Sequence, residues 1–151
     1  MAIETTLILV KPDGVSRNLT GEIVARIERK GYVITAMKLM QLSGDKAREH
    51  YAEHKDRPFF GELVTFITSG PLLALAVEGE GAVEGLRQII GATDPLKAAP
   101  GSIRADLARS IGSNLVHGSD SAASAARELK IFFTESDFVE RRHDVDYWKK
   151  H

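Results

Sequence analysis

Short apolar runs alternate with helical patterns along this 151-residue chain, and this alternation constrains its fold more than any other feature. Strand-like runs, which are apolar and partly β-branched, lie at 6–10, 32–42, 72–77 and 131–133. Between them apolar residues recur at spacings of three and four, as at Val83, Leu86 and Ile90, which is typical of a helix with one buried face. Helices that alternate with strands pack against a single sheet. The pattern leaves open whether that sheet is parallel and doubly wound or antiparallel and ferredoxin-like.

Residues that begin or stop helices divide the helical segments. Helices are predicted at 20–30, 43–54, 58–67, 83–90, 103–108 and, in an alanine-rich stretch, up to Leu129. Gly31 and Gly91 end two of these helices, and the stretch 92–101 loses the periodicity. The sequence contains no internal repeat, low-complexity tract or linker. We therefore expect a single domain over residues 1–151, which is a common domain size.

The composition excludes several classes of protein. The chain has no cysteine, so it is neither a disulfide scaffold nor a thiolate enzyme. The N-terminus lacks the pattern of a secretory signal, and no apolar stretch approaches the roughly 20 residues that span a bilayer. Lys and Arg number 20 against 21 Asp and Glu, without the basic excess usual in nucleic-acid binders. We expect a cytoplasmic protein with no dedicated nucleic-acid or membrane partner, in which any bound anion is held at a local site.

The stretch NLVHGSDS, residues 114–121, places a histidine beside a glycine at the start of a predicted helix. Gly118 permits unusual backbone conformations or the close approach of a ligand, and the three polar residues after it are all suited to cap a helix. A helix N-terminus offers unpaired N–H groups and partial positive charge, which favours phosphate. Two interpretations of His117 are open at this point: a functional group beside a phosphate site, or a loop residue packed on Tyr51 or Trp148.

Two other patterns around histidines are weaker. His50 and His54 stand in H-Y-A-E-H, which matches the H-x-x-E-H zinc pattern, and a helix would place both rings on one face. No separate third ligand is marked, so a charged helix face is the preferred interpretation. A Ser/His/Asp triad within 117–120 is also disfavoured, because triad residues normally converge from separate parts of a chain.

Cationic and polar residues at the ends of predicted elements favour phosphate chemistry. The set comprises Lys11, Arg87, Thr93, Arg104 and Asn114. Phosphoryl transfer needs positioning and positive charge more than covalent help from the protein. The chain has no P-loop, so side chains and helix ends would have to supply both. The alternative for each of these residues is a solvated position on the surface.

A histidine can itself attack phosphorus and divide one transfer into two steps, which gives ping-pong kinetics. One ring nitrogen must then be neutral, while a partner on the other nitrogen fixes the tautomer. Glu128, about three turns along the helix that follows His117, is the nearest suitable carboxylate in the sequence. Its alternative role is that of a surface glutamate.

Motifs along nearly the whole chain resemble those of the nucleoside diphosphate kinase family, in the family's order and spacing. They are KPDGV at 11–15, GEI at 21–23, HY at 50–51, RPFF at 57–60, SGP at 69–71, PGSIR at 100–104 and NLVHGSDS at 114–121. The resemblance implies an α+β fold with a ferredoxin-like βαββαβ core, a four-stranded antiparallel sheet and additional helices. It also implies an enzyme that transfers the γ-phosphate of a nucleoside triphosphate to a nucleoside diphosphate.

The resemblance assigns roles to particular residues. His117 is implied to be the phosphorylated nucleophile, with Glu128 orienting its ring, Ser119 supporting Glu128 and Tyr51 helping to hold His117. Lys11 is implied to contact the transferring phosphoryl group. The residues implied to bind the nucleotide are Lys11, Phe59, Leu63, Arg87, Thr93, Arg104, Ile111 and Asn114. The implied cofactor is Mg²⁺, carried by the nucleotide phosphates without protein ligands of its own.

The chain departs from the family near both ends. Thr5 stands in ETT where members often have ERT, which puts a local ion pair in doubt, and the C-terminal Lys-Lys-His gives no basis for a guanine contact. The long tail with Trp148 resembles hexameric members, so we expect a homo-oligomer, with a hexamer favoured over a tetramer. The alternative function is a ferredoxin-like nucleotide-binding module without catalysis. An inactive relative of that kind would lose His117 or Lys11, and both are present.

Overall fold

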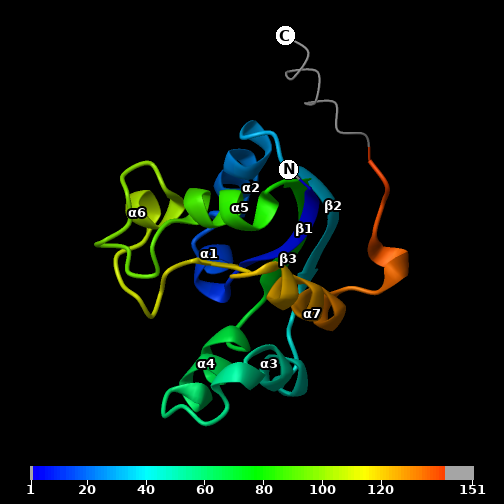
Figure 1. Cartoon of the computed structure of the whole chain (residues 1–151). Helices are drawn as coiled ribbons and strands as arrows, with labels where there is room; N and C mark the ends of the chain where they lie inside the picture. Colours follow the sequence, from blue (N-terminus) through cyan, green and yellow to red (C-terminus); the bar gives the residue numbers. More distant parts are fainter. Residues whose placement is uncertain (1, 142–151) are drawn as a thin grey trace.

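A four-stranded antiparallel sheet forms the centre of the computed structural model, which describes residues 2–141 (Figure 1). Its strands are β1 (Ile3–Val10), β2 (Val33–Met40), β3 (Leu72–Glu80) and β4 (Val116–Gly118), in the order β2-β3-β1-β4. Every neighbouring pair is antiparallel. The main helices between β1 and β2 and between β3 and β4 complete a βαββαβ core. The prediction of an antiparallel, ferredoxin-like α+β fold is therefore confirmed, and the doubly wound alternative is wrong.

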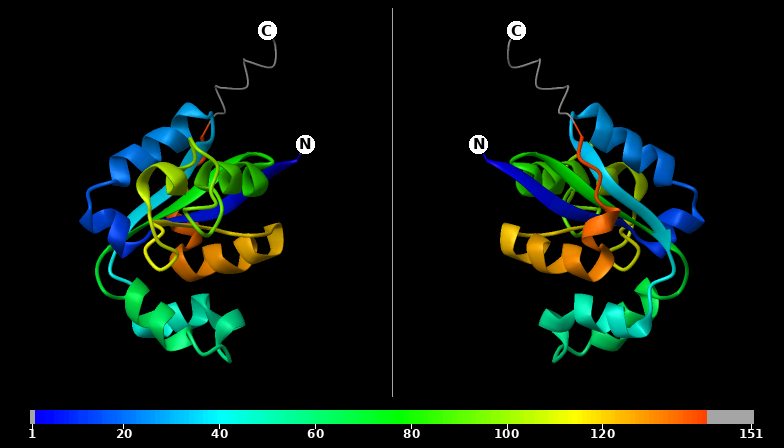
Figure 2. Two further views of the ribbon diagram at one scale, coloured as in Figure 1. Left: turned by 90° about the vertical axis from the view of Figure 1, so that its left-hand side faces the viewer. Right: turned by 90° about the vertical axis from the view of Figure 1, so that its right-hand side faces the viewer.

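The helices form a layer on each face of the sheet. They are α1 (Pro12–Ser16), α2 (Thr20–Arg29), α3 (Gly44–His50), α4 (Phe60–Ile67), α5 (Ala82–Ile90), α6 (Ile103–Leu107) and α7 (Ala122–Phe132), with 3₁₀ turns at Ala52–His54 and Glu135–Asp137. Helices α2 and α5 cover one face and α7 covers the other, while the α3–α4 pair lies beyond α7 (Figure 2). None of the helices within residues 2–141 is both long and apolar enough to cross a membrane.

The alternation of β1 divides the core into two halves. Successive side chains of a strand point to opposite faces of a sheet. Ile8 and Val10 pack with α2 and α5, whereas Leu7 and Leu9 pack with α3, α4 and α7. All four are fully buried, which explains why this run is apolar throughout rather than alternating. β1 is thus the central strand against which both helical layers and β4 are positioned.

The structure corrects the predicted strand at 131–133. Helix α7 continues to Phe132, and its buried residues Ala125, Glu128, Ile131 and Phe132 repeat at the three- to four-residue spacing of a helix face. A short apolar run does not by itself distinguish a strand from a buried helix end. The fourth strand is instead β4, which contains His117, and the predicted helix over 43–54 is also interrupted, because α3 ends at His50.

Candidate active site

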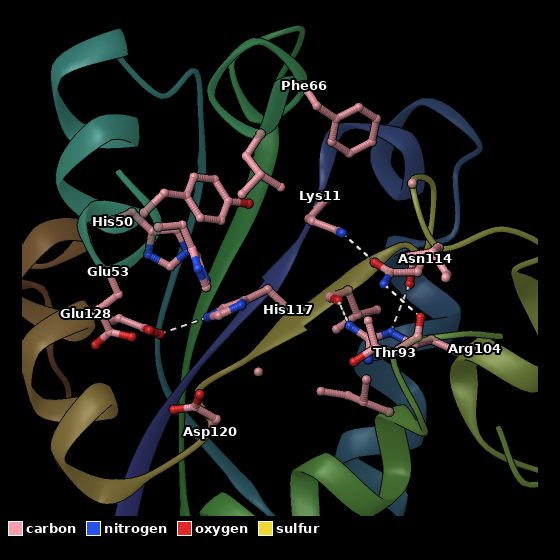
Figure 3. Close-up of a pocket in the computed structure, with 18 of the residues that line it drawn as sticks. Lys11, His50, Glu53, Phe66, Thr93, Arg104, Asn114, His117, Asp120 and Glu128 are labelled. Carbon is pink, nitrogen blue, oxygen red and sulfur yellow. Dashed lines mark hydrogen bonds and ion pairs between the residues drawn. The ribbon is translucent and has the colours of Figure 1, made fainter. Parts of the chain in front are cut away.

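A cleft of about 830 Å³ opens between the α3–α4 pair and the loops on either side of α6 (Figure 3). Eleven of the residues implied by the resemblance line this cleft: Lys11, Tyr51, Phe59, Leu63, Arg87, Thr93, Arg104, Ile111, Asn114, His117 and Glu128. Ser119 lies behind the cleft wall, where it is fully buried. The structure therefore brings the whole predicted set to one place, although its members come from almost every part of the chain.

His117 is held on the floor of the cleft by β4. It pairs with Leu9 across the β1–β4 ladder, and Gly118 follows it so closely against α5 that an added Cβ would lie 2.7 Å from Ile90 Cδ1. Helix α7 starts shortly afterwards, and Ser121 caps it by accepting a hydrogen bond from the Ser124 N–H at 3.0 Å. His117 is thus a strand residue next to a helix start rather than part of a mobile loop.

Glu128 reaches the back of the His117 ring from the buried face of α7. His117 Nε2 lies 2.8 Å from Glu128 Oε1, and the Ser119 hydroxyl donates to the same oxygen at 2.8 Å. Burial disfavours the charged carboxylate, but the hydrogen bonds from His117 and Ser119 and the adjacent imidazoles outweigh it, so the pKa of Glu128 is lowered. A charged carboxylate at this position fixes Nε2 as the protonated nitrogen and leaves Nδ1 as the basic one.

His50 stands edge-on against His117, a neighbour that sequence reasoning missed. The two ring centroids are 4.7 Å apart at 82°, and the side chain of His50 is buried between His117, Tyr51 and Phe132. Burial, reinforced by the His117 charge, lowers the pKa of His50 to about 3, so His50 is neutral at physiological pH. The H-x-x-E-H match marked this residue, but its burial and its contact with a residue 67 positions away could not be inferred from that pattern.

Tyr51 and Phe66 complete the wall on the side of α3 and α4. The Tyr51 ring packs on His50 rather than directly on His117, with centroids 4.8 Å apart. Burial, together with the nearby Glu128 charge, raises the pKa of Tyr51 to about 12, so its hydroxyl keeps its proton. Phe66, another residue that the sequence did not single out, places its ring centroid 5.6 Å from Lys11 Nζ.

Lys11 and Asn114 face each other on the opposite side of His117. The Lys11 ammonium donates to Asn114 Oδ1, and the Asn114 amide donates to the Thr93 carbonyl at 3.1 Å. Burial lowers the pKa of Lys11 to about 8; Asp13 counteracts this effect and Arg104 adds to it. The ammonium is poorly solvated at this position, so it gains strongly from an incoming anion.

Arg104 is fixed by backbone carbonyls before any ligand arrives. Its guanidinium donates to the carbonyls of Asn114 at 3.3 Å, Gly91 at 3.1 Å and Val116 at 2.6 Å. Burial, with the repulsion of Arg87, lowers the pKa of Arg104 to about 10. Arg104 therefore stays charged at neutral pH and is already oriented, which lowers its own ordering cost when a phosphate binds.

Apolar side chains line the mouth of the cleft. Phe59 is 42% exposed and Ile111 57%, and Leu63 also lines the cleft. Phe59 is flanked by His54, with ring centroids 5.8 Å apart. Exposed apolar faces on a cleft with a cationic floor suit a ligand that has a flat ring at one end and phosphates at the other.

Fold and cleft together define a class of protein: a ferredoxin-like protein with a histidine, hydrogen-bonded to a carboxylate, in a cleft lined by cations and apolar side chains. A sequence model of the family described as nucleoside diphosphate kinase matches residues 4–138. A nucleoside diphosphate kinase of Parafrankia is 65% identical over 133 residues, which are 88% of this chain and 97% of the relative; one of Oceanobacillus iheyensis is 53% identical over 146 residues, 97% of this chain and 99% of the relative.

Solved structures agree with these sequences. The halophilic nucleoside diphosphate kinase of Halobacterium salinarum, solved in complex with CDP, superposes with a TM-score of 0.94 at 46% identity and covers 97% of this chain and 98% of its own. A nucleoside diphosphate kinase family protein of Babesia bovis gives 0.93 at 43% identity, covering 96% and 98%. The chain belongs to the nucleoside diphosphate kinase family. It is a phosphotransferase with nucleoside diphosphate kinase activity.

Proposed function

We propose that the chain transfers the γ-phosphate in two steps through a phosphohistidine at His117 Nδ1. The observation that carries this proposal is the His117–Glu128 hydrogen bond of 2.8 Å, which occupies Nε2 and leaves Nδ1 to react. In the first step the Nδ1 lone pair bonds to the γ-phosphorus of a nucleoside triphosphate while the bond from phosphorus to the bridging β-phosphate oxygen breaks. The departing nucleoside diphosphate keeps that electron pair. Glu128 balances the positive charge that the ring acquires.

The second step reverses the first with a different nucleotide. A β-phosphate oxygen of the incoming nucleoside diphosphate attacks the phosphorus, the N–P bond breaks, and the electron pair returns to Nδ1. Both steps would take place in one cleft, which Lys11, Arg87 and Arg104 line. These cations would therefore supply positive charge to the phosphate oxygens in each step. Lys11 and Asn114 would also hold the ribose, and Thr93 a phosphate.

The apolar mouth explains how one cleft would serve every base. Stacking between Phe59 and Ile111, with Leu63 at the side, recognises a π-face and not the hydrogen-bonding edge of a base. The cofactor of the proposal is Mg²⁺, which would arrive on the nucleotide and neutralise charge between its phosphates.

Mass spectrometry of the intact protein tests this proposal. After incubation with ATP and Mg²⁺ we expect one added phosphate per chain, which is lost in mild acid and discharged by any nucleoside diphosphate. His117→Gln should abolish both the added mass and the exchange while nucleotide binding persists. A wild-type chain that binds nucleotides but never gains mass would favour the alternative of a binding module without catalysis.

We also infer a homo-oligomer, a hexamer in preference to a tetramer, and a cytoplasmic chain that acts as one domain over residues 1–151. The edge strand β2 supports the oligomer. Its apolar side chains Met37 and Leu39 are 58% and 66% exposed in the single chain, and contact with a second copy would bury them. The predicted anchor in the tail, Trp148, lies outside the described residues. A family match over residues 4–138 and a single continuous sheet support one domain.

A further inference from the structure

Three side chains of types that can bind a metal ion lie close together in the cleft: His117 and, beside its ring, His50 and Glu128. His50 comes from the end of α3, His117 from β4 and Glu128 from α7, and one ligand atom of each lies within 4.8 Å of the other two. Figure 3 shows that His50 and Glu128 lie on the side of the His117 ring that faces away from Lys11 and Asn114.

His50 has a buried ring nitrogen without a hydrogen-bond partner among the described residues. Its side chain is 3% exposed, and Nδ1 has no hydrogen-bond partner among the described residues. A buried polar atom without a partner is unfavourable, and such atoms in native structures call for an explanation such as an unseen ion or water. A metal binds imidazole through a nitrogen lone pair, and the unpartnered Nδ1 shows that the nitrogens of His50 are not all engaged by other groups.

We propose that His50, His117 and Glu128 form a binding site for a divalent transition-metal ion of the Zn²⁺ type. Two imidazoles and one carboxylate are a recognised ligand set for Zn²⁺, with a fourth position left for water. Mg²⁺ prefers an all-oxygen octahedron, so it does not compete for this set. The ligands of a tetrahedral zinc lie roughly 3.4 Å apart, which requires only small movements from the present positions.

Glu128 presents Oε1 to the cluster, where this oxygen already accepts hydrogen bonds from His117 and Ser119. Arg127 Nη2 lies 3.7 Å from Glu128 Oε2, which neutralises one side of the carboxylate, whereas Oε1 already faces His117 at 2.8 Å. His50, His117 and Glu128 all line the open cleft, so an ion can reach them from solvent. The sequence pattern had paired His50 with His54, but His54 lies outside the cluster, and residues remote in sequence take its place.

Occupation of this site inhibits phosphoryl transfer; this consequence alone rests on the proposed phosphohistidine. Binding of the ion at His117 Nε2 would release the proton of that nitrogen to solvent and replace the hydrogen bond to Glu128. It withdraws electron density from the ring and places a fixed positive charge where Glu128 would balance the charge of phosphorylation. Zn²⁺ in the presence of excess Mg²⁺ should therefore slow phosphorylation of His117 without displacing the nucleotide.

Calorimetric titration of the nucleotide-free protein with ZnCl₂ in excess MgCl₂ tests the site without any catalytic step. We expect one ion per chain in the wild type and a loss of affinity of about tenfold or more in His50→Gln. The matched control is His54→Gln, which removes an imidazole from the same cleft outside the cluster and should bind as the wild type does. Equal affinity in His50→Gln and the wild type, or no binding to the wild type, would overturn the proposal.

X-ray absorption at the zinc edge of the wild-type complex keeps the test independent of how well the variant folds. Two imidazoles and a carboxylate oxygen around the ion are expected. A spectrum with one imidazole or none would refute the site. Because neither measurement involves nucleotide, a failure here leaves the phosphohistidine proposal standing, and a failure to gain phosphate leaves the metal site standing.

Discussion

The orientation of the His117 ring depends on one charged hydrogen bond from its Nε2 to Glu128 Oε1. In Glu128→Gln the amide can still accept that hydrogen bond but carries no charge to balance the phosphorylated ring. We expect the rate of His117 phosphorylation to fall roughly 10- to 100-fold, the usual effect of losing a group that orients and charges a reactive imidazole. Rapid-quench measurement with excess ATP gives this rate directly.

Ser119→Ala is the matched control for Glu128→Gln. It removes one of the two hydrogen bonds that Glu128 Oε1 accepts and leaves the carboxylate charge in place. A smaller loss than in Glu128→Gln is expected. An unchanged phosphorylation rate in Glu128→Gln would show that the charge of Glu128 has no part in the chemistry.

Lys11 makes nucleotide binding depend on pH. Burial lowers its pKa to about 8, so above that pH the free cleft loses a positive charge. A bound phosphate restores the advantage of the charged form, and binding therefore takes up a proton at alkaline pH. We expect the Kd for ADP to rise by up to about tenfold per pH unit above pH 8 and to be nearly flat between pH 6.5 and 7.5. Fluorescence titrations across this range measure the effect.

The lowered pKa of Lys11 also affects the stability of the fold: alkaline pH weakens nucleotide binding but raises the contribution of Lys11 to the free energy of unfolding. Between pH about 8 and the ordinary lysine value of 10.5, the unfolded chain binds more protons at this position than the folded chain. The Lys11 contribution to the free energy of unfolding therefore increases as the pH rises through this window.

Lys11→Met is the control for the pH dependence of ADP binding. This variant should not show the rise in the Kd above pH 8, and a rise that persists in it would assign the effect to another group.

At the scale of elements, β4 can reach its position only because Gly118 has no side chain. An added Cβ would lie 2.7 Å from Ile90 Cδ1 on α5 and 3.4 Å from Ile8 Cδ1 on β1. In Gly118→Ala either Ile90 changes rotamer or β4 shifts, and overpacking of this kind costs roughly 1–3 kcal/mol. We expect a lower free energy of unfolding in urea and, because His117 precedes Gly118, slower phosphorylation.

Two further variants separate overpacking from a general effect of alanine. Gly21→Ala, on α2, meets no atom within 4 Å and should raise stability by about 0.5–1 kcal/mol, because Gly is a poor helix residue. Ile90→Val shortens the side chain that Gly118→Ala would contact, so it should recover part of the loss in the double variant. If the double variant is no more stable than Gly118→Ala, the contact with Ile90 is not the cause.

The elements differ in how far the sequence determines them. The periodic helices and the β1 and β3 runs were predictable because their patterns are local, and the resemblance supplied the antiparallel topology. The run 131–133 was assigned wrongly because strand and helix end look alike over three apolar residues. Leu115 shows a second limit. It adopts a φ of +73°, and the contacts that hold it come from residues remote in sequence: its N–H donates to Asp13 Oδ2 at 3.0 Å, and its carbonyl accepts from the Lys11 N–H at 2.8 Å.

The site shows the same division at the scale of the whole molecule. Motifs identified the residues of the cleft, but not the partner of each one. His50, Phe66 and Arg127 line the same cleft without having been predicted, because burial and side-chain direction depend on how α3, α4 and α7 pack together. A balanced net charge of −1 likewise conceals a cationic floor made by Lys11, Arg87 and Arg104.

The catalytic and phosphate-binding residues named above lie together within one chain, so we expect a dissociated chain to retain them. Among the described residues after α7, the Val139 N–H donates to the Thr35 carbonyl at 2.9 Å, Arg141 donates to the Ile34 carbonyl at 2.8 Å, and Asp137 accepts from Lys38 at 3.1 Å. Further along, Met37 and Leu39 remain exposed on the edge strand, and a second copy of the chain could bury them.

Leu39→Lys should therefore weaken the oligomer, because burying an unpaired ammonium in an apolar contact is costly. Sedimentation velocity is expected to give six copies for the wild type and smaller species for this variant, while Leu39→Met keeps the apolar contact and the wild-type assembly. Phosphorylation of His117 should persist in the dissociated chains, since His117, Glu128 and the cations remain together. An unchanged sedimentation coefficient in Leu39→Lys would remove β2 from the interface, and a four-copy wild type would reject the hexamer.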